Sequence, residues 1–268
     1  MNKSRFRKLA SEVNAHVQPL SAETMAKLKK APQAQKRTAK FKKAVYIVEH
    51  LVFKGPYRCD DIGLMNNLKY TYALQLLEAA LNLHERQRSS LQWKCIGWEG
   101  DNKCYLVAPN VGKRNNIHFE LVTTKIEKNV KVVPRGEIIK RVSDIEETEN
   151  LTDDIKLATL QHLYLRFLLG IGDSGTYNIL VREDNDSNDR LIAGIDLEES
   201  RNIGVKERRL DLLFSKTPYK KHIVLYESDI CKIKSISYDQ LDQYTLARLN
   251  DVGIDLERLK RNIELWEK

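Results

Sequence analysis

Apolar residues recur at helical spacing in two long segments of the chain. Within 67–86 they stand at 68, 72, 73, 76, 77, 80, 81 and 83, and the segment 151–169 has a comparable stripe. A period near 3.6 residues predicts a helix that is buried along one side. His162 falls at the border of the second stripe, so we expect it to contact the core. Two closing helices are predicted at 237–250 and 255–267, because Ser237 and Asp255 suit helix N-caps.

Other segments have the composition of strands. Residues 44–54 are rich in β-branched and aromatic side chains, which predicts one strand that ends near Lys54. The polar residues 99–102 separate two apolar runs and predict a hairpin. Further strands are expected at 117–126, 130–133, 178–181 and 191–195. Strands, one helix, more strands and then helices predict an α+β fold.

Composition places the chain among globular proteins. It has 268 residues, of which 42% are hydrophobic and 31% charged. No apolar run approaches the roughly 18 residues needed to cross a bilayer, and the first residues lack the apolar region of a secretory signal. Its four cysteines form no C-x-x-C pair, although Cys95 and Cys104 could face each other across the predicted hairpin. We therefore expect an intracellular protein, cytoplasmic or nuclear, that is not secreted and has no transmembrane segment.

The net charge of +8 is concentrated at one end of the chain. Residues 1–43 contain 12 Lys and Arg against two Glu, a balance of +10, which leaves −2 for the remainder. Helix-forming composition at 4–17 and 21–31 then predicts a basic helical arm and linker over residues 1–40. Such an arm is either a solvated tail or a contact surface, through residues 1–43, for nucleic acid or another polyanion, such as an acidic protein or anionic lipid.

Three polar residues stand at intervals that suit phosphoryl transfer. Asp173 follows Gly170-Ile171-Gly172, Asn178 comes five residues later, and Asp196 follows the second strand of a predicted hairpin. Protein kinases use an Asp, an Asn and a second Asp in this order to position the acceptor hydroxyl and to hold magnesium. The alternative is an ordinary turn at Asp173, with Asn178 and Asp196 at strand ends.

The stretch 161–199 resembles the catalytic and metal loops of the phosphatidylinositol 3-/4-kinase-like (atypical protein kinase-like) superfamily, which read G-x-G-D-R-H-x-x-N and later D-F-G. The resemblance implies that Asp173 is catalytic and that Asn178 and Asp196 bind ATP through Mg²⁺. The chain departs from the family at two places. Ser174-Gly175 replaces the Arg-His pair, whose His takes part in catalysis in the family, and Leu197-Glu198 replaces Phe-Gly.

The same resemblance covers Phe53-Lys54 and the Asp60-Asp61 pair that follows. It implies that Lys54 binds the α/β-phosphates of ATP and that Asp60, Asp61 or, on the following helix, Glu78 orients it. Taken alone, Lys54 also fits an exposed lysine before a Gly-Pro turn. About ten residues of strand precede Lys54, too few for a full phosphate-covering hairpin. Either the linker at 33–43 completes the hairpin or this lobe is truncated.

We therefore expect a two-lobed, protein-kinase-like fold, with a small β-rich N-lobe at 41–140 and a reduced, mainly helical C-lobe at 150–268. The weakly preferred adenine-facing hinge is 119–124. The implied activity is transfer of the ATP γ-phosphoryl group to a hydroxyl of a protein or of a phosphoinositide. The alternative is a weak or inactive pseudokinase that acts as a structural or binding protein through its basic arm. The basic residues of 198–221 form either an activation segment or a solvated loop.

Overall fold

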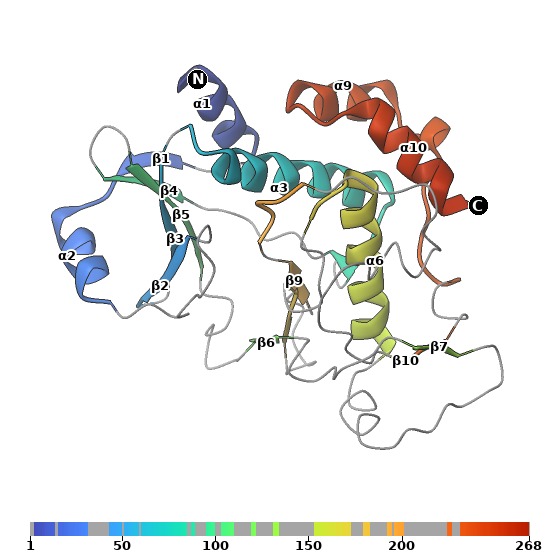
Figure 1. Ribbon diagram of the computed structural model, residues 1–268, viewed down its shortest axis with the longest axis horizontal. Coiled ribbons are helices and arrows are strands. Elements are labelled where there is room, and N and C mark those ends of the chain that lie inside the picture. The colour runs from blue at the N-terminus through green and yellow to red at the C-terminus, as the bar shows by residue number, and fades with distance from the viewer. Residues whose placement is uncertain are drawn as a thin grey trace.

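The structure is a computed structural model of an α+β protein (Figure 1). It describes residues 3–13, 16–31, 43–49, 51–58, 60–84, 87–88, 95–99, 103–109, 119–121, 131–133, 153–172, 179–182, 192–194, 196–200, 224–226 and 231–267. Over these residues it has six α-helices and three small sheets, which confirms the predicted α+β class.

The largest sheet has five strands in the order β1-β4-β5-β3-β2. Its antiparallel centre contains the hairpin of β4 (Cys95–Glu99) and β5 (Lys103–Pro109), so the predicted hairpin at 99–102 is confirmed. Cys95 lies opposite Val107 and Cys104 opposite Trp98, so the two cysteines do not face each other as suggested. The register places them three pairs apart because the hairpin is centred on position 101, whereas facing cysteines would require a centre between 99 and 100.

Residues 44–54 form two strands where the sequence predicted one. β2 (Ala44–Val48) and β3 (Leu51–Arg58) pair as an antiparallel hairpin with Val48 opposite Leu51. The chain reverses at Glu49, which has a left-handed φ of 56°, as tight hairpin turns require. Lys54 therefore lies in the second strand of a short hairpin, opposite Val45. Residues 32–42 of the linker lie outside the described residues.

The first helix is part of the core, so residues 3–13 are not the solvated tail that was one of the two predictions for residues 1–40. α1 (Lys3–Glu12) is followed by β1 (His16–Pro19), which pairs in parallel with β4. Phe6, Leu9, Ala10 and Val13 are buried in the main core. Their spacing is that of one helix face, so the exposed basic residues of α1 occupy the opposite face. α2 (Ala22–Lys30) lies within the predicted helix 21–31, has Ser21 as its N-cap and buries Leu28 in a second cluster.

α3 (Ile62–Ala80) is the central helix of the molecule. In Figure 1 it extends from the five-stranded sheet toward α6 (Asp153–Leu169), with α1 and α9 (Gln243–Asp251) along its upper side. α10 (Leu256–Glu267) packs on both α6 and α9. One continuous hydrophobic cluster runs from Phe6 on α1 to Trp266 on α10. The helices predicted within 67–86, 151–169 and 255–267 are thus confirmed, with α3 beginning five residues earlier than expected. In the segment 237–250, Ser237 precedes only a 3-10 turn, and the α-helix begins at Gln243 with Asp242 as its N-cap.

A three-stranded antiparallel sheet leads to the predicted metal loop. It has the order β6-β8-β9, formed by Phe119–Leu121, Ile179–Arg182 and Ile192–Gly194. β8 and β9 are the predicted strands on either side of the polar insert. A separate parallel pair joins β7 (Lys131–Val133) to β10 (Val224–Tyr226), and a 3-10 turn, η3 (Tyr238–Gln240), precedes α9. Of the helices that the structure describes, none is both long and apolar enough to cross a membrane.

Candidate functional site

A nearly buried lysine lies between two carboxylates where β3 meets the segment after β9. Lys54 Nζ is 2.6 Å from Asp196 Oδ1 and 2.6 Å from Glu198 Oε1. The side chains of Lys54 and Asp196 are each 8% exposed, and that of Glu198 is 13% exposed. Lys54 and Asp196 are 142 residues apart in the sequence, so this contact depends on the tertiary fold. The structure thus brings together two of the residues that the sequence assigned to nucleotide binding.

An irregularity in β3 directs two of its side chains to the same place. Residues an odd number apart point to opposite faces of a regular strand, yet Lys54 Nζ and Tyr57 Oη both contact Glu198 Oε1. The pairing of β3 with β5 shifts register between Lys54 and Tyr57, at Gly55-Pro56. Such a bulge re-aims the side chains next to it. Gly55-Pro56, which the sequence suggested was a simple turn, therefore forms the bulge that brings the Lys54 and Tyr57 side chains to the same carboxylate.

Tyr57 donates its hydroxyl to Glu198 Oε1 over 2.5 Å and is fully buried. Burial, together with the negative charge of Glu198, raises the pKa of Tyr57 well above its usual value. The hydroxyl therefore remains a hydrogen-bond donor at neutral pH. Glu198 Oε1 thus forms an ion pair with the Lys54 ammonium and accepts a hydrogen bond from the Tyr57 phenol, and the two contacts together fix the carboxylate in one orientation.

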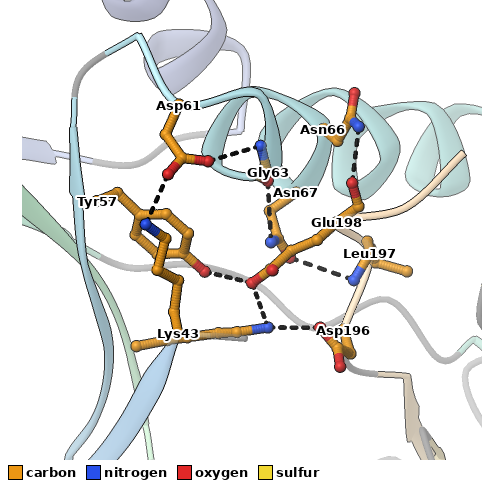
Figure 2. Close-up of polar contacts among 10 residues, drawn as sticks. Lys43, Tyr57, Asp61, Gly63, Asn66, Asn67, Asp196, Leu197 and Glu198 are labelled. Atoms are coloured by element: carbon orange, nitrogen blue, oxygen red, sulfur yellow. Dashed lines mark hydrogen bonds and ion pairs between the residues drawn. The ribbon is translucent and has the colours of Figure 1, made fainter. Parts of the chain in front are cut away.

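The first turns of α3 hold the main chain that carries the two carboxylates. Asn66 Nδ2 donates to the carbonyl of Glu198 over 2.7 Å, and Asn67 Oδ1 accepts from the amide of Leu197 over 3.3 Å. Figure 2 shows both asparagines reaching from the helix to this segment. Asp196 itself has a left-handed φ of 62°. Non-glycine residues adopt this conformation rarely, and such residues cluster at functional sites.

None of the three carboxylates predicted to orient Lys54, on α3 or just before it, contacts the lysine in this way. Asp61 caps α3 by accepting from Gly63 N over 2.9 Å, and its other oxygen lies 2.7 Å from Lys43 Nζ (Figure 2). Asp60, the alternative, pairs with Arg58 at an exposed position. Glu78 is buried on α3, twelve residues beyond Asn66. At 1.5 Å per residue that is about 18 Å along the helix. Glu198 provides the contact that was assigned to these residues.

The chain that leads to Asp173 is tied to the same segment. Gly172 N donates to the carbonyl of Glu199 over 2.9 Å, and Ile171 forms a β-bridge with Ser200. Gly170 ends α6 with a left-handed φ of 61°, and its carbonyl accepts from Arg258 Nη2 of α10. Asp173 and Asn178 lie outside the described residues, so their assigned roles stay predictions. Gly172, the residue before Asp173, is nevertheless hydrogen-bonded to Glu199, which lies three positions after Asp196.

The described part of the site suits the predicted magnesium in its donor chemistry. Mg²⁺ prefers carboxylate oxygens and uses one or two of them together with substrate phosphates. Asp196 supplies such oxygens in a nearly buried position, and its predicted partner ligand is Asn178. Within the described ranges, no three His, Cys, Asp or Glu side chains gather as a metal site of their own.

His162 lies beside the β8–β9 sheet and is fully buried, which confirms its expected place in the core. It accepts a hydrogen bond from Arg166 Nε over 2.9 Å. Burial, and then the positive charge of Arg166, lower the pKa of His162 well below 6.5. The ring is thus neutral and serves as an acceptor.

No protein-family model matches the chain, and no curated protein is significantly similar to it in sequence. The sequence had singled out Lys54 and Asp196 but missed Glu198, Tyr57, Asn66 and Asn67. The one signal for Glu198 in the sequence is its nearness to Asp196, because the left-handed φ of Asp196 means that the same-side rule of an extended strand does not apply here. Glu198 follows Asp196 by two residues.

Proposed function

We propose that this chain is an ATP- and magnesium-dependent phosphotransferase with a divergent, two-lobed fold of the phosphatidylinositol 3-/4-kinase-like type. The observation that carries the proposal is the contact of Lys54 with Asp196 in a nearly buried site. Both residues were assigned to nucleotide binding from the sequence, although they lie 142 positions apart in the chain. A chance pair of turn residues gives no reason for Asp196 to meet that particular lysine.

Each residue has a role that its chemistry supports. An ammonium group has three hydrogens. Lys54 Nζ donates one of them to Asp196 Oδ1 and forms an ion pair with Glu198, so a further hydrogen can be donated to a phosphate oxygen of ATP. Asp196, with Asn178, would hold Mg²⁺, which neutralises charge that develops on the transferred group. Asp173 would position the acceptor hydroxyl, which belongs to a protein or to an inositol lipid.

The second candidate function is that of a weak or inactive pseudokinase with a structural or binding role. The observation that favours it is the same ion pair, because Lys54 Nζ contacts the Asp196 oxygen Oδ1, an oxygen to which a metal would otherwise bind. The replacement of Arg-His by Ser174-Gly175 points in the same direction. Contact with a polyanion would then involve the basic residues of 1–43, with α1 and α2 as part of the fold.

The two candidates differ in their response to magnesium. If the chain is a phosphotransferase, ATP should raise the melting temperature of the full chain more with Mg²⁺ than with EDTA, because a ligand stabilises the state that it binds. Asp196→Ala should remove the magnesium-dependent part of the shift. Asp60→Ala, at an exposed acid near the site, is the matched control and should keep it. A parent protein that does not respond to ATP would favour the pseudokinase.

A further inference from the structure

Glu198 stands where the resembled family has the glycine of D-F-G, and a side chain at this position has a specific set of contacts here. We propose that Glu198 is the positioning residue that orients Lys54 toward the phosphates of the nucleotide. This inference rests on the proposed function and adds to it the carboxylate that the sequence assigned to Asp61 or Glu78. Those two carboxylates are occupied or distant, as described above.

The contacts of Glu198 fix both its side chain and its main chain. Its Oε1 atom forms an ion pair with Lys54 Nζ at 2.6 Å and accepts a hydrogen bond from the Tyr57 hydroxyl over 2.5 Å. Its carbonyl accepts from Asn66, and the preceding amide donates to Asn67. Figure 2 shows this carboxylate pointing from the segment after β9 toward the Tyr57 hydroxyl. Because these contacts already fix the Glu198 side chain, little further side-chain entropy is lost when Glu198 orients Lys54 toward a bound nucleotide.

Two carboxylates on one lysine allow a division of roles when the nucleotide binds. A carboxylate that ligates Mg²⁺ turns its charge toward the metal, so Asp196 would give up part of its contact with Lys54. Glu198 lies two residues further along and would keep Lys54 in place through that exchange. With Asp196 alone, the same oxygen would have to serve both the lysine and the metal.

The charge of Glu198 can be removed with little change in shape. Glu198→Gln keeps the size of the side chain but replaces a carboxylate by an amide, so the charge-assisted bond to Lys54 is lost. Tyr57→Phe removes one hydroxyl and leaves the carboxylate without its second donor. Glu12→Gln is the matched control. Glu12 is 14% exposed, against 13% for Glu198, and pairs with Arg248 away from Lys54.

The decisive experiment compares ATP with adenosine, because Lys54 would contact only the phosphates. Dissociation constants are measured by calorimetric titration of the full chain with Mg²⁺ present. Glu198→Gln should weaken ATP binding roughly tenfold, the loss expected for one charge-assisted hydrogen bond, and leave adenosine binding unchanged. Tyr57→Phe should give a smaller loss of the same kind. Glu12→Gln should lower the melting temperature and leave both affinities unchanged.

A double variant separates positioning from a general structural effect. If Glu198 acts through Lys54, then adding Glu198→Gln to Lys54→Met should cause no further loss of ATP affinity. Equal losses for ATP and adenosine, or an additive double variant, would overturn the inference. So would an unchanged ATP affinity in Glu198→Gln while the parent chain binds ATP, and the proposed function would survive that result. A parent chain that binds no ATP would overturn both.

Discussion

Phe6→Ala should destabilise the whole protein, because α1 belongs to the main core. The Phe6 side chain is 1% exposed. Losing about 120 Å² of buried apolar surface at ~25 cal/mol per Å² costs about 3 kcal/mol. The residual cavity brings core Phe→Ala changes to about 3–5 kcal/mol. Because Phe6 is near the chain end, where the structure can relax, we expect about 3 kcal/mol.

Urea unfolding followed by circular dichroism measures this free energy, as a shift of the midpoint at a constant slope. Arg7→Ala is the control, because Arg7 is the next residue and is exposed. Exposed substitutions of this kind change the free energy of unfolding by about 0.5 kcal/mol or less. A loss below about 1 kcal/mol for Phe6→Ala, similar to that of Arg7→Ala, would refute the reasoning. Such a result would mean that residues 1–13 form the separate basic arm that their charge suggested.

Two further predictions concern His162 and its surroundings. Because the pKa of His162 is lowered in the folded state, the unfolded chain binds the proton first as the pH falls. Below pH 6.5 the free energy of unfolding of the wild type should fall by about 1.4 kcal/mol per pH unit relative to that of His162→Gln, and above pH 6.5 the difference should stay constant. Urea unfolding at several pH values measures this difference, and parallel pH profiles for the two proteins would contradict the prediction. Gly194→Ala places a Cβ 2.2 Å from His162 Nε2 and should cost about 1–3 kcal/mol in the same assay, whereas an unchanged midpoint would contradict the close packing.

The sequence predicted elements well where the signal was local. Apolar spacing was sufficient for α3 and α6, cap residues indicated the closing helices, and polar turn residues were sufficient for the β4–β5 and β8–β9 hairpins but not for β2–β3. For α1 the sequence predicted a helix within 4–17 but not its burial, because the basic residues indicated a solvated arm although Phe6, Leu9, Ala10 and Val13 form an apolar stripe. The parallel pairing of β1 with β4 joins residues 79 positions apart, as with His16 and Cys95. Nothing in the four residues of β1 specifies that partner.

The candidate site shows the same limit. Lys54 and Asp196 could be chosen because each stands in a recognisable local pattern. Glu198 could not be chosen in this way, because its contact with Lys54 depends on the bulge that brings Tyr57 and Lys54 to one side of β3. It also depends on Asn66 and Asn67 meeting a segment about 130 residues away. Pairing of charges across such distances is decided by the tertiary fold.

The central claim is that Asp196 and Lys54 form a magnesium-dependent nucleotide site. It is tested most directly by the dissociation constant of ATP, measured by calorimetric titration with Mg²⁺ and with EDTA, in the parent chain and in Asp196→Ala. We predict tighter binding with Mg²⁺ in the parent and equal, weak binding under both conditions in the variant. Absence of ATP binding in the parent, or a magnesium effect that persists in Asp196→Ala, would contradict the claim.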